Sequence, residues 1–411
     1  MRILYLNTTY AGGGAEKVVR QIYQGMQQRG HEVYEIVCYN RRGNIDDPHV
    51  HVLYPNDLMK IFMRVQTYNR GNHNKTIPYA ISYIRKFVKE HQIELIHLHN
   101  PHDNFLGIHD IAALTQLCPV VWTLHDLWAL TGHCAFPYGC VEGWSRECAG
   151  CQHLELYPRL RKDRSKELWK EKKAAFTGKD FHFTVPSQWM KAQVEHSYLK
   201  EESCQVIDNS IDVSLWKPLE KAEVRKKYDL DPAKYVLAFV AADLQVPQKG
   251  MKILLESLQK LEHKEKYQLL VAGKGSEKAE ELFAGFAVKS FGYISDQKQM
   301  NEFLSMADLM VNPSVYETFG LVNIEAMVSG TPVLAFDIGV MSEVVGEHGW
   351  CVPEVSAQAL AEKISEITDD RAMLQQKTDK CYAYIQEKYD EGLMLDRFEN
   401  LYRQVAKVKE V

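Results

Sequence analysis

The sequence predicts an α/β protein built from two doubly wound parallel sheets, and three observations carry this prediction. The chain has 411 residues, which is too long for one compact core and suggests two or three domains at roughly 100–200 residues each. Short apolar segments alternate with amphipathic helical segments, as in a parallel sheet with helices on both faces. The same alternation starts again after residue 204.

The first half opens with a βαβ unit. Arg2–Asn7 is an apolar strand, residues 11–15 form a glycine-rich loop, and an amphipathic helix is predicted over Glu16–Arg29. Gly30 ends that helix before a strand over residues 31–37. Later strands are expected at Leu95–Leu98, Val120–Leu124 and Phe181–Val185, and helices near Ile77–His91 and Glu167–Phe176.

The second half repeats the alternation after a turn-rich link at residues 207–218. Strands are expected at Tyr235–Ala241, Gln268–Ala272, around Phe291, at Leu309–Asn312 and at Pro332–Phe336. Helices are expected at Gly250–Leu261, Gln297–Met306, Leu321–Val328, Ala357–Asp369, Ala372–Lys388 and Glu391–Val408. We therefore expect one domain over residues 1–204, a second over 205–390, and a C-terminal helix over 391–411 that packs back toward the first domain.

Composition and charge narrow the class of protein. A 45% apolar fraction, a 25% charged fraction and a net charge of −5 are typical of a globular protein and disfavour one that coats nucleic acid. The longest apolar stretch, Tyr235–Ala242, is far shorter than the roughly 20 residues of a membrane-spanning helix. The N-terminal residues turn polar too early for a signal peptide, so we expect a cytoplasmic enzyme.

The charge is unevenly distributed along the chain. Residues 1–204 carry a balance of +4 and 14 of the 16 histidines, whereas residues 205–411 carry −9. This asymmetry suggests two halves with different partners. The alternative is drift among solvated surface residues.

The strongest functional signal lies in the second half. A strand ends at Asn312, a loop carries Glu317, and Gly320 stands at the start of a helix. Free N–H groups at a helix start suit a phosphate or sugar oxygen. Glu325 in the second turn is suited to a vicinal diol such as ribose, and Glu317 to hexose hydroxyls. The alternative is two solvated glutamates.

Two further features follow neighbouring strands of the same predicted sheet. Lys249 stands beside Gly250 at the start of a helix, where a lysine suits a diphosphate. Gly273 follows the next strand, where the backbone can approach a ligand closely. Ligands of doubly wound sheets bind at the carboxyl ends of the strands. These features therefore predict one binding edge, although each alone is also compatible with an ordinary surface residue.

Four of the nine cysteines fall within 18 positions. They are Cys134, Cys140, Cys148 and Cys151. In an intracellular protein this density favours a closed structural zinc site, for which His133 is a substitute ligand. Disulfides, redox-labile thiols or no bonded role are the alternatives.

A basic stretch over residues 157–179 carries nine lysines and arginines interleaved with apolar residues. Such a helix is able to rest on anionic lipid, which would place the protein peripherally on the inner face of the cytoplasmic membrane. The alternative is a solvated, charge-laced helix.

Taken together, the motifs resemble the family 4 retaining glycosyltransferases. In the second half the resemblance is carried by Lys249-Gly250, Glu317 and Glu325 with seven residues between them, Gly320-Leu321-Val322, and Ser329-Gly330-Thr331-Pro332-Val333. In the first half it is carried by Gly13-Gly14-Ala15-Glu16 and His125-Asp126, and in the link after it by the Asn209-Ser210-Ile211-Asp212 hinge. The histidine-rich stretch 96–128, with cysteines after it, resembles the branch that builds bacterial capsule, exopolysaccharide and O-antigen.

The resemblance implies the GT-B fold, in which two Rossmann-like domains face each other across a cleft. It implies a hexosyltransferase-type enzyme that moves a sugar from a UDP- or GDP-sugar to a saccharide or lipid-linked saccharide, with retention and without a catalytic cofactor. No nucleic-acid partner is expected, in keeping with the net charge of −5.

The same resemblance assigns roles to residues. Lys249 would bind the donor diphosphate, Glu317 the donor sugar, and His125 would lie near the anomeric carbon. These three are the expected catalytic residues. The expected donor-binding residues are Gly13, Gly14, Gly273, Phe319, Gly320, Leu321, Val322 and Glu325, of which Glu325 would hold the ribose.

The sequence also departs from the family pattern. The family's arginine shortly before the lysine is missing from residues 243–248, so one diphosphate cation is absent or comes from elsewhere. A sugar-nucleotide epimerase of the same fold and a non-catalytic nucleotide-sugar-binding protein are the alternative functions. An NAD-dependent dehydrogenase is disfavoured because Gly12-Gly13-Gly14 does not match Gly-x-Gly-x-x-Gly.

Overall fold

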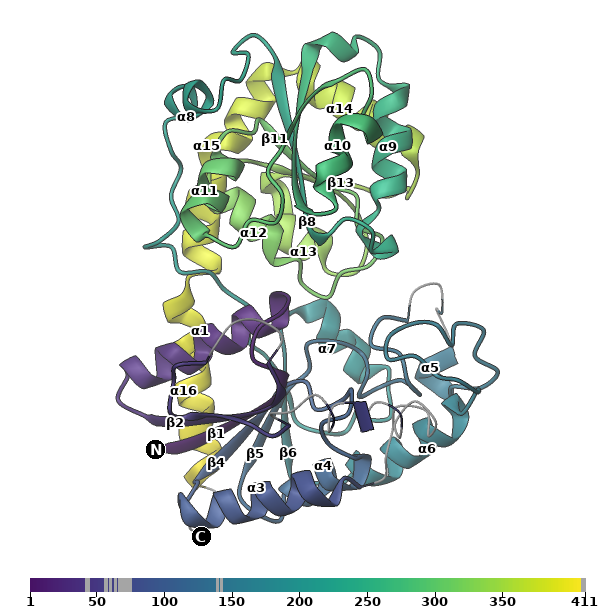
Figure 1. The fold of residues 1–411 in the computed structure, drawn as a ribbon, viewed down its shortest axis with the longest axis vertical. Coiled ribbons are helices and arrows are strands. Elements are labelled where there is room, and N and C mark those ends of the chain that lie inside the picture. Colours follow the sequence, from purple (N-terminus) through teal and green to yellow (C-terminus); the bar gives the residue numbers. More distant parts are fainter. Residues whose placement is uncertain are drawn as a thin grey trace. The chain divides into compact units, whose positions relative to one another are not determined.

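A computed structural model describes the chain except residues 41–44, 55–57, 59–60, 63–64, 66–75, 138–139, 141–142 and 408–411. The chain forms two compact units, one of residues 1–208 with 395–411 and one of residues 209–394. Each unit is a parallel sheet with helices packed against it (Figure 1).

The first unit contains a seven-stranded parallel sheet in the order β3-β2-β1-β4-β5-β6-β7. Its strands are β1 (Arg2–Thr9), β2 (Glu32–Tyr39), β3 (Val50–Val52), β4 (Leu95–Leu98), β5 (Val120–Thr123), β6 (Phe181–Val185) and β7 (Cys204–Val206). The order reverses between β1 and β4, which makes the sheet doubly wound. The central strands β1, β4 and β5 are mostly apolar and, apart from Arg2 at the start of β1, fully buried, as expected for strands with helices on both faces.

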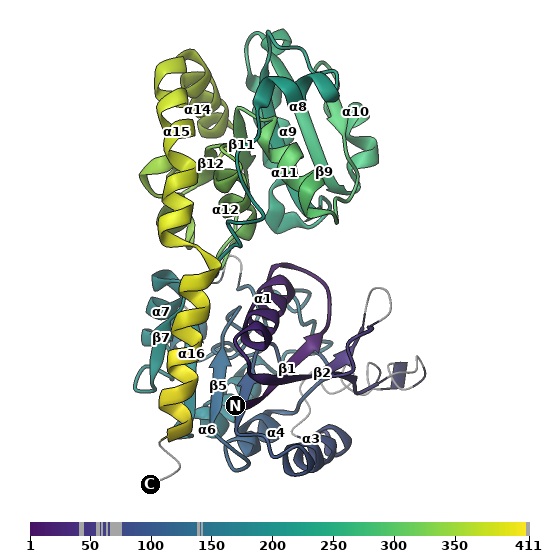
Figure 2. The same cartoon turned by 90° about the vertical axis from the view of Figure 1, so that its left-hand side faces the viewer.

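Helices of the first unit connect these strands. They are α1 (Gly14–Gln28), α3 (Pro78–Glu90), α4 (Ile108–Leu114), α5 (Gly143–Arg146), α6 (Ser165–Phe176) and α7 (Gln188–Glu195). The C-terminal helix α16 (Glu391–Lys407) belongs to this unit from Leu395 onward. It runs alongside the sheet (Figure 2), and its Phe398 and Tyr402 rings pack on His97. A Cβ at Gly25 would lie 2.4 Å from Leu395, so α1 and α16 approach closely because of that glycine.

The second unit repeats the design with six parallel strands in the order β10-β9-β8-β11-β12-β13. They are β8 (Tyr235–Asp243), β9 (Tyr267–Lys274), β10 (Ala287–Ser290), β11 (Leu309–Asn312), β12 (Val333–Phe336) and β13 (Trp350–Val352). The α-helices are α8 (Lys221–Lys227), α9 (Met251–Lys260), α10 (Ala279–Leu282), α11 (Gln297–Ser305), α12 (Leu321–Val328), α13 (Met341–Val345), α14 (Ala357–Asp369) and α15 (Arg371–Lys388).

The predicted fold class is confirmed, and one strand assignment is wrong. Phe291 does not lie in a strand, because β10 ends at Ser290 and the Phe291 ring turns onto Tyr228 and Phe303. The helix expected at Leu321–Val328 is α12, with the same bounds. In the part of the chain that the structure describes, no helix is long and apolar enough to cross a bilayer.

Candidate active site

Lys249 and Glu317 form an ion pair at the carboxyl edge of the second sheet. Lys249 ends the 3₁₀ helix η1 (Pro247–Lys249) that follows β8, and Glu317 lies between β11 and α12. The Lys249 ammonium donates to Glu317 Oε1, and the Ser314 hydroxyl donates to the same oxygen at 3.0 Å. The other oxygen, Oε2, accepts no hydrogen bond from the described residues. The pair therefore fixes the carboxylate and leaves one acceptor for a ligand.

The backbone around Lys249 is packed against the loop that carries Glu317. Gly250 has φ +70°, and a Cβ there would lie 1.9 Å from the carbonyl oxygen of Pro313. The Val315 N–H donates to the carbonyl of Gln248 at 2.9 Å. Only glycine satisfies both the conformation and the close approach. The loop that carries Lys249 and the loop that carries Glu317 are consequently held tightly against each other.

The helix α12 begins where the loop ends, and an asparagine pair fixes its first turn. Gly320 is its N-cap residue in the left-handed region, with φ +78°. Asn312 Nδ2 donates to Asn323 Oδ1 at 2.8 Å, and the Ser314 N–H donates to Asn312 Oδ1 at 3.1 Å. Because the first N–H groups of an α-helix lack intrahelical partners, Leu321 and Val322 offer amides to an anion.

Phe319, which precedes Gly320, has a buried side chain. Its side chain is 3% exposed and packs edge-on against Tyr389. Only the backbone of Phe319 is thus suited to a ligand, whereas its ring belongs to the core.

Glu325 and Gly273 complete the set predicted in this unit. Glu325 lies in the second turn of α12 and is 7% exposed. Gly273, near the end of β9, has φ +134°, and a Cβ there would lie 2.0 Å from the carbonyl oxygen of Ala241. Lys274 beside it is 77% exposed and lies 3.9 Å from the Asp243 carboxylate. It is a second cation at the carboxyl end of a neighbouring strand, β9.

In the first unit, Gly13 and Gly14 lie at the start of α1, in the loop after β1. Both are exposed, Gly13 is the N-cap, and Gly14 is the first residue of the helix. The Gly13 N–H donates to the Glu16 carboxylate at 2.7 Å. The 15-residue helix α1 presents its positive end here.

His125 and Asp126 follow β5 and are held by two other histidines. His125 Nε2 lies 3.0 Å from His99 Nδ1, and Asp126 Oδ2 lies 3.0 Å from His102 Nε2. Burial lowers the pKa of His125 to about 4, so its ring is neutral at pH 7. The sequence pattern did not indicate these pairings, because each joins residues 24 or 26 positions apart.

Cys134, Cys140, Cys148 and Cys151 lie in one segment as free thiols. Cys148 accepts the Gly132 N–H at 3.1 Å, and Cys151 Sγ lies 3.4 Å from His133 Nε2. Cys134 is buried and Cys140 half-buried. Among the residues with a described placement, no three histidine, cysteine or acidic side chains are arranged to hold a metal ion. The zinc site stays a prediction.

The basic helix α6 turns its apolar side inward. Leu168, Trp169 and Phe176 are at most 5% exposed. Lys172 is fully buried and donates to the carbonyls of Trp128 and Thr131 at 2.6 and 3.1 Å. The apolar side of this helix is therefore occupied by the protein itself and is not free for lipid.

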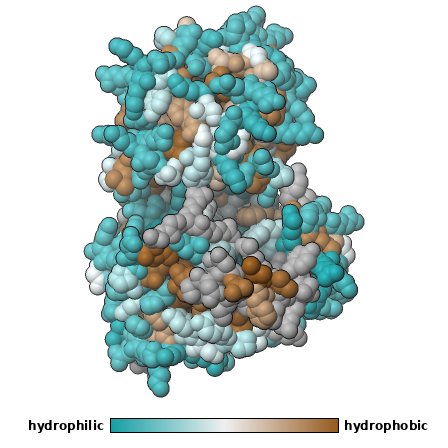
Figure 3. Space-filling model, viewed as in Figure 1, coloured by the Kyte–Doolittle hydropathy of each residue, from teal (hydrophilic) through white to brown (hydrophobic). Residues whose placement is uncertain are grey.

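A different segment exposes apolar side chains. Leu58, Ile61, Phe62 and Val65 are helical and between 55% and 82% exposed. Their spacing of three, four and seven positions puts them on one side of a helix. Figure 3 shows hydrophobic patches on the surface of the first unit.

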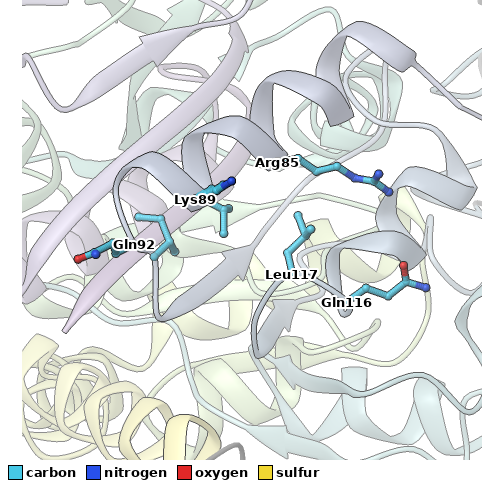
Figure 4. A pocket seen from close by; sticks show the side chains of 7 residues that line it. Arg85, Lys89, Gln92, Gln116 and Leu117 are labelled. Carbon is cyan, nitrogen blue, oxygen red and sulfur yellow. The ribbon is translucent and has the colours of Figure 1, made fainter.

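A hollow of about 560 Å³ lies elsewhere in the first unit, between α3 and the segment after α4. Arg85, Lys89 and Gln92 line one side, and Gln116 and Leu117 the other (Figure 4). Its Ile93 wall precedes β4, so the hollow is at the amino ends of the strands. The site residues described above follow the carboxyl ends, so this hollow is not part of the candidate site.

Two doubly wound domains in series, with glycine turns and a lysine–glutamate pair at a carboxyl strand edge, define an enzyme of the GT-B fold class. A model described as Glycosyltransferase Family 4 matches residues 12–215, and one described as Glycosyl transferases group 1 matches residues 220–388. The chain belongs to the family 4 glycosyltransferases.

Individual proteins are similar over most of the chain. A protein of Escherichia coli assigned to colanic acid biosynthesis as a glycosyl transferase, WcaC, is 27% identical over 370 residues, which cover 85% of this chain and 86% of that protein. Sucrose-phosphate synthase of Thermosynechococcus elongatus has a similar fold, with a TM-score of 0.75, 22% identity and 99% of both chains covered. Anabaena HepE in complex with UDP-glucose has a TM-score of 0.66 at 17% identity, with 100% of this chain and 99% of that chain covered.

Proposed function

We propose that this glycosyltransferase moves a hexosyl group, with retention, from a UDP- or GDP-sugar to a saccharide or lipid-linked saccharide in polysaccharide biosynthesis. The observation that carries the proposal is the Lys249–Glu317 pair at the carboxyl edge of the second sheet, in the two loops that contain Gly250 and Gly320. The Anabaena relative of the same fold is described in complex with UDP-glucose, and the Escherichia coli relative is assigned to colanic acid biosynthesis. Both support the proposal.

The donor would be held mainly by the second unit. Lys249 and the first amides of α12 would contact the diphosphate, and Glu325 would accept hydrogen bonds from the ribose diol. Lys274 is the candidate for the second cation, in place of the arginine that the family usually has before Lys249. Glu317 Oε2 would accept a hydroxyl of the donor sugar.

In the reaction, the bond between the anomeric carbon and the diphosphate oxygen breaks, and a bond to the acceptor hydroxyl oxygen forms on the same face of the sugar. The acceptor proton passes to the leaving phosphate. The transition state resembles an oxocarbenium ion, and the departing diphosphate gains negative charge. The Lys249 ammonium and the helix amides would stabilise that charge electrostatically. No protein carboxylate needs to form a covalent intermediate.

The family resemblance also assigns donor contacts to residues of the first unit. The neutral His125 ring would form a hydrogen bond to the donor sugar, and the amides of Gly13 and Gly14 would contact the diphosphate. These two roles rest on the family resemblance.

Activity assays with purified variants test the assignment. We expect Lys249→Ala and Glu317→Ala each to lower turnover at least tenfold without unfolding, because each removes a charged partner from the donor. Lys252→Ala is the matched control, since this lysine of α9 is 89% exposed. Rates in Lys249→Ala and Glu317→Ala equal to those of the wild type would contradict the site assignment.

The products separate the three candidate activities. Incubation with UDP- and GDP-sugars should release nucleoside diphosphate at a high rate only when acceptor is present. Formation of an epimeric sugar nucleotide without acceptor would indicate the epimerase instead. Nucleotide binding without turnover of any donor and acceptor pair would indicate the non-catalytic alternative.

We also propose that the protein is cytoplasmic and contacts an anionic membrane peripherally through the exposed side chains at positions 58, 61, 62 and 65. Flotation with anionic vesicles at low salt should show association, and Ile61→Asn with Phe62→Ser should abolish it. Lys166→Gln with Lys170→Gln tests the basic helix α6 instead, where both lysines contact Glu147. If only Lys166→Gln with Lys170→Gln abolished the association with vesicles, the membrane contact would lie at α6 and not at positions 58, 61, 62 and 65, which would contradict this proposal.

A further inference from the structure

Two histidines, His97 and His99, lie in a row behind His125 at the carboxyl ends of β4 and β5. His97 lies in β4, and His99 follows the end of that strand, two positions later and on the same face. The His99 and His125 rings are stacked at 25° with centroids 5.2 Å apart. The Trp122 indole N–H donates to the His99 carbonyl at 3.0 Å, which fixes the backbone of His99. His99 is 1% exposed and His125 is 7% exposed.

The contact between the two rings requires one donor and one acceptor. Burial holds the pKa of His99 well below its usual range and lowers that of His125 to about 4, so both rings are neutral near pH 7. A neutral imidazole carries one N–H and one lone pair. Only one of the atoms His99 Nδ1 and His125 Nε2 therefore carries the shared proton across their 3.0 Å contact.

The far side of His99 decides which atom it is. His99 Nε2 is buried and has no hydrogen-bond partner in the structure. A buried N–H without a partner costs about 1–3 kcal/mol, and orphaned N–H groups are rare. If His99 carries its proton on Nδ1, the buried Nε2 is only a lone pair and the N–H is satisfied by His125. The opposite arrangement would leave an orphaned N–H in the core.

The neighbouring histidine His102 has the same arrangement, with one ring nitrogen paired and the other buried without a partner. Its Nε2 faces the Asp126 carboxylate at 3.0 Å, which requires an N–H there, and its buried Nδ1 has no partner. His97 differs because both of its nitrogens are engaged, with Tyr402 at 2.6 Å and Thr123 at 2.7 Å. In both unpaired cases, placing the lone pair on the orphaned atom satisfies every ring N–H.

We infer that His99 is a positioning residue that sets the tautomer of His125, so that His125 accepts at Nε2 and presents an N–H at Nδ1. Among the described residues, Nδ1 of His125 has no hydrogen-bond partner. The ring consequently offers a neutral donor of fixed direction, suited to a hydroxyl or phosphate oxygen. That the recipient is the donor sugar rests on the proposed function, whereas the tautomer does not.

Nitrogen-15 long-range NMR of histidine-labelled protein tests the tautomer directly, without substrate. His125 should show a protonated Nδ1 and an unprotonated Nε2 in the wild type, assigned by loss of its signals in His125→Asn. In His99→Phe, which removes the donor, His125 should shift toward the Nε2-protonated form. A wild-type His125 protonated at Nε2 would overturn the inference, even in a protein that proves to have no transferase activity.

Kinetics of matched variants test the consequence for function. His99→Asn keeps an N–H near the Nδ1 position and should retain most of the wild-type kcat, whereas His99→Phe should lower kcat at least tenfold. Thermal unfolding identifies any variant that fails to fold. Where a variant does not fold, the tautomer of His125 in the wild-type protein decides the inference instead of the kinetics. Equal loss of kcat in folded His99→Asn and His99→Phe would contradict the positioning role.

Discussion

A lysine and a glutamate 68 positions apart in the sequence make the most informative contact in the molecule. The sequence predicted that Lys249, Glu317 and Glu325 follow the carboxyl ends of neighbouring strands, because residue type and strand order suffice for that. It did not predict the ion pair or the hydroxyl of Ser314 on the same carboxylate, since these depend on side-chain directions. The pairing of His99 with His125 was missed for the same reason.

At the residue scale, we predict that Glu325 acts in donor binding more than in the chemical step. Glu325→Ala should raise the KM for the donor at least tenfold and change kcat less, because a ribose contact stabilises the ground state and the transition state alike. Glu347→Ala is the control, since Glu347 is an exposed glutamate of the same unit. A fall in kcat with an unchanged KM would place Glu325 elsewhere in the reaction.

Elements were predicted best where they are buried and long enough to show a pattern. Leu95–Leu98, Phe181–Val185 and Leu309–Asn312 are strands at the predicted residues, as Leu321–Val328 and Ala357–Asp369 are helices. The edge strands β3, β7 and β13 have three residues each and were not predicted. Three residues are too few to show a period, and such strands exist because a neighbouring strand supplies hydrogen bonds.

The turn that joins β8 to α9 should be intolerant of a side chain. Gly250→Ala should lower the free energy of unfolding by roughly 3 kcal/mol or more. The added Cβ would clash with the Pro313 carbonyl, and alanine would also be strained in the left-handed conformation of this residue. Gly292→Ala shares the positive φ but has open space, so about 1–2 kcal/mol is expected. Urea unfolding measures both, and equal losses would contradict the close packing of the two loops.

The helix α6 carries a pH prediction through its buried lysine. Burial lowers the pKa of Lys172 to about 7 in the folded protein, against about 10.4 when unfolded. Between these values the unfolded chain binds a proton that the folded chain does not, so stability rises with pH, by at most about 1.4 kcal/mol per pH unit. Lys172→Met should remove this rise between pH 7 and 10. Unfolding curves with identical pH dependence in both proteins would refute the assignment.

The cysteine segment is tested by metal analysis. Protein purified under reducing conditions should contain about one equivalent of zinc, and Cys148→Ser with Cys151→Ser should contain none. Binding would require the thiols to turn toward one another from the positions they take in the structure. Less than half an equivalent of zinc in the wild type would refute the prediction.

At the scale of the whole molecule, two sheets that share the order of their first six strands explain the repeated alternation in the sequence. The net charge of −5 hides the contrast between a first half of +4 and a second half of −9. The proposed donor residues Lys249, Glu317 and Glu325 all lie in the acidic half. An anionic diphosphate there depends on local cations and amides, because the overall charge of that half repels it.

Nucleotide binding measured by calorimetry tests this account most directly. Wild-type protein should bind UDP or GDP, and Lys249→Ala should weaken that binding about 10- to 100-fold, since a hydrogen bond to a charged group is worth about 1.5–3 kcal/mol. Lys252→Ala should bind as the wild type does. Unchanged affinity in Lys249→Ala would contradict the placement of the donor at the carboxyl edge of the second sheet.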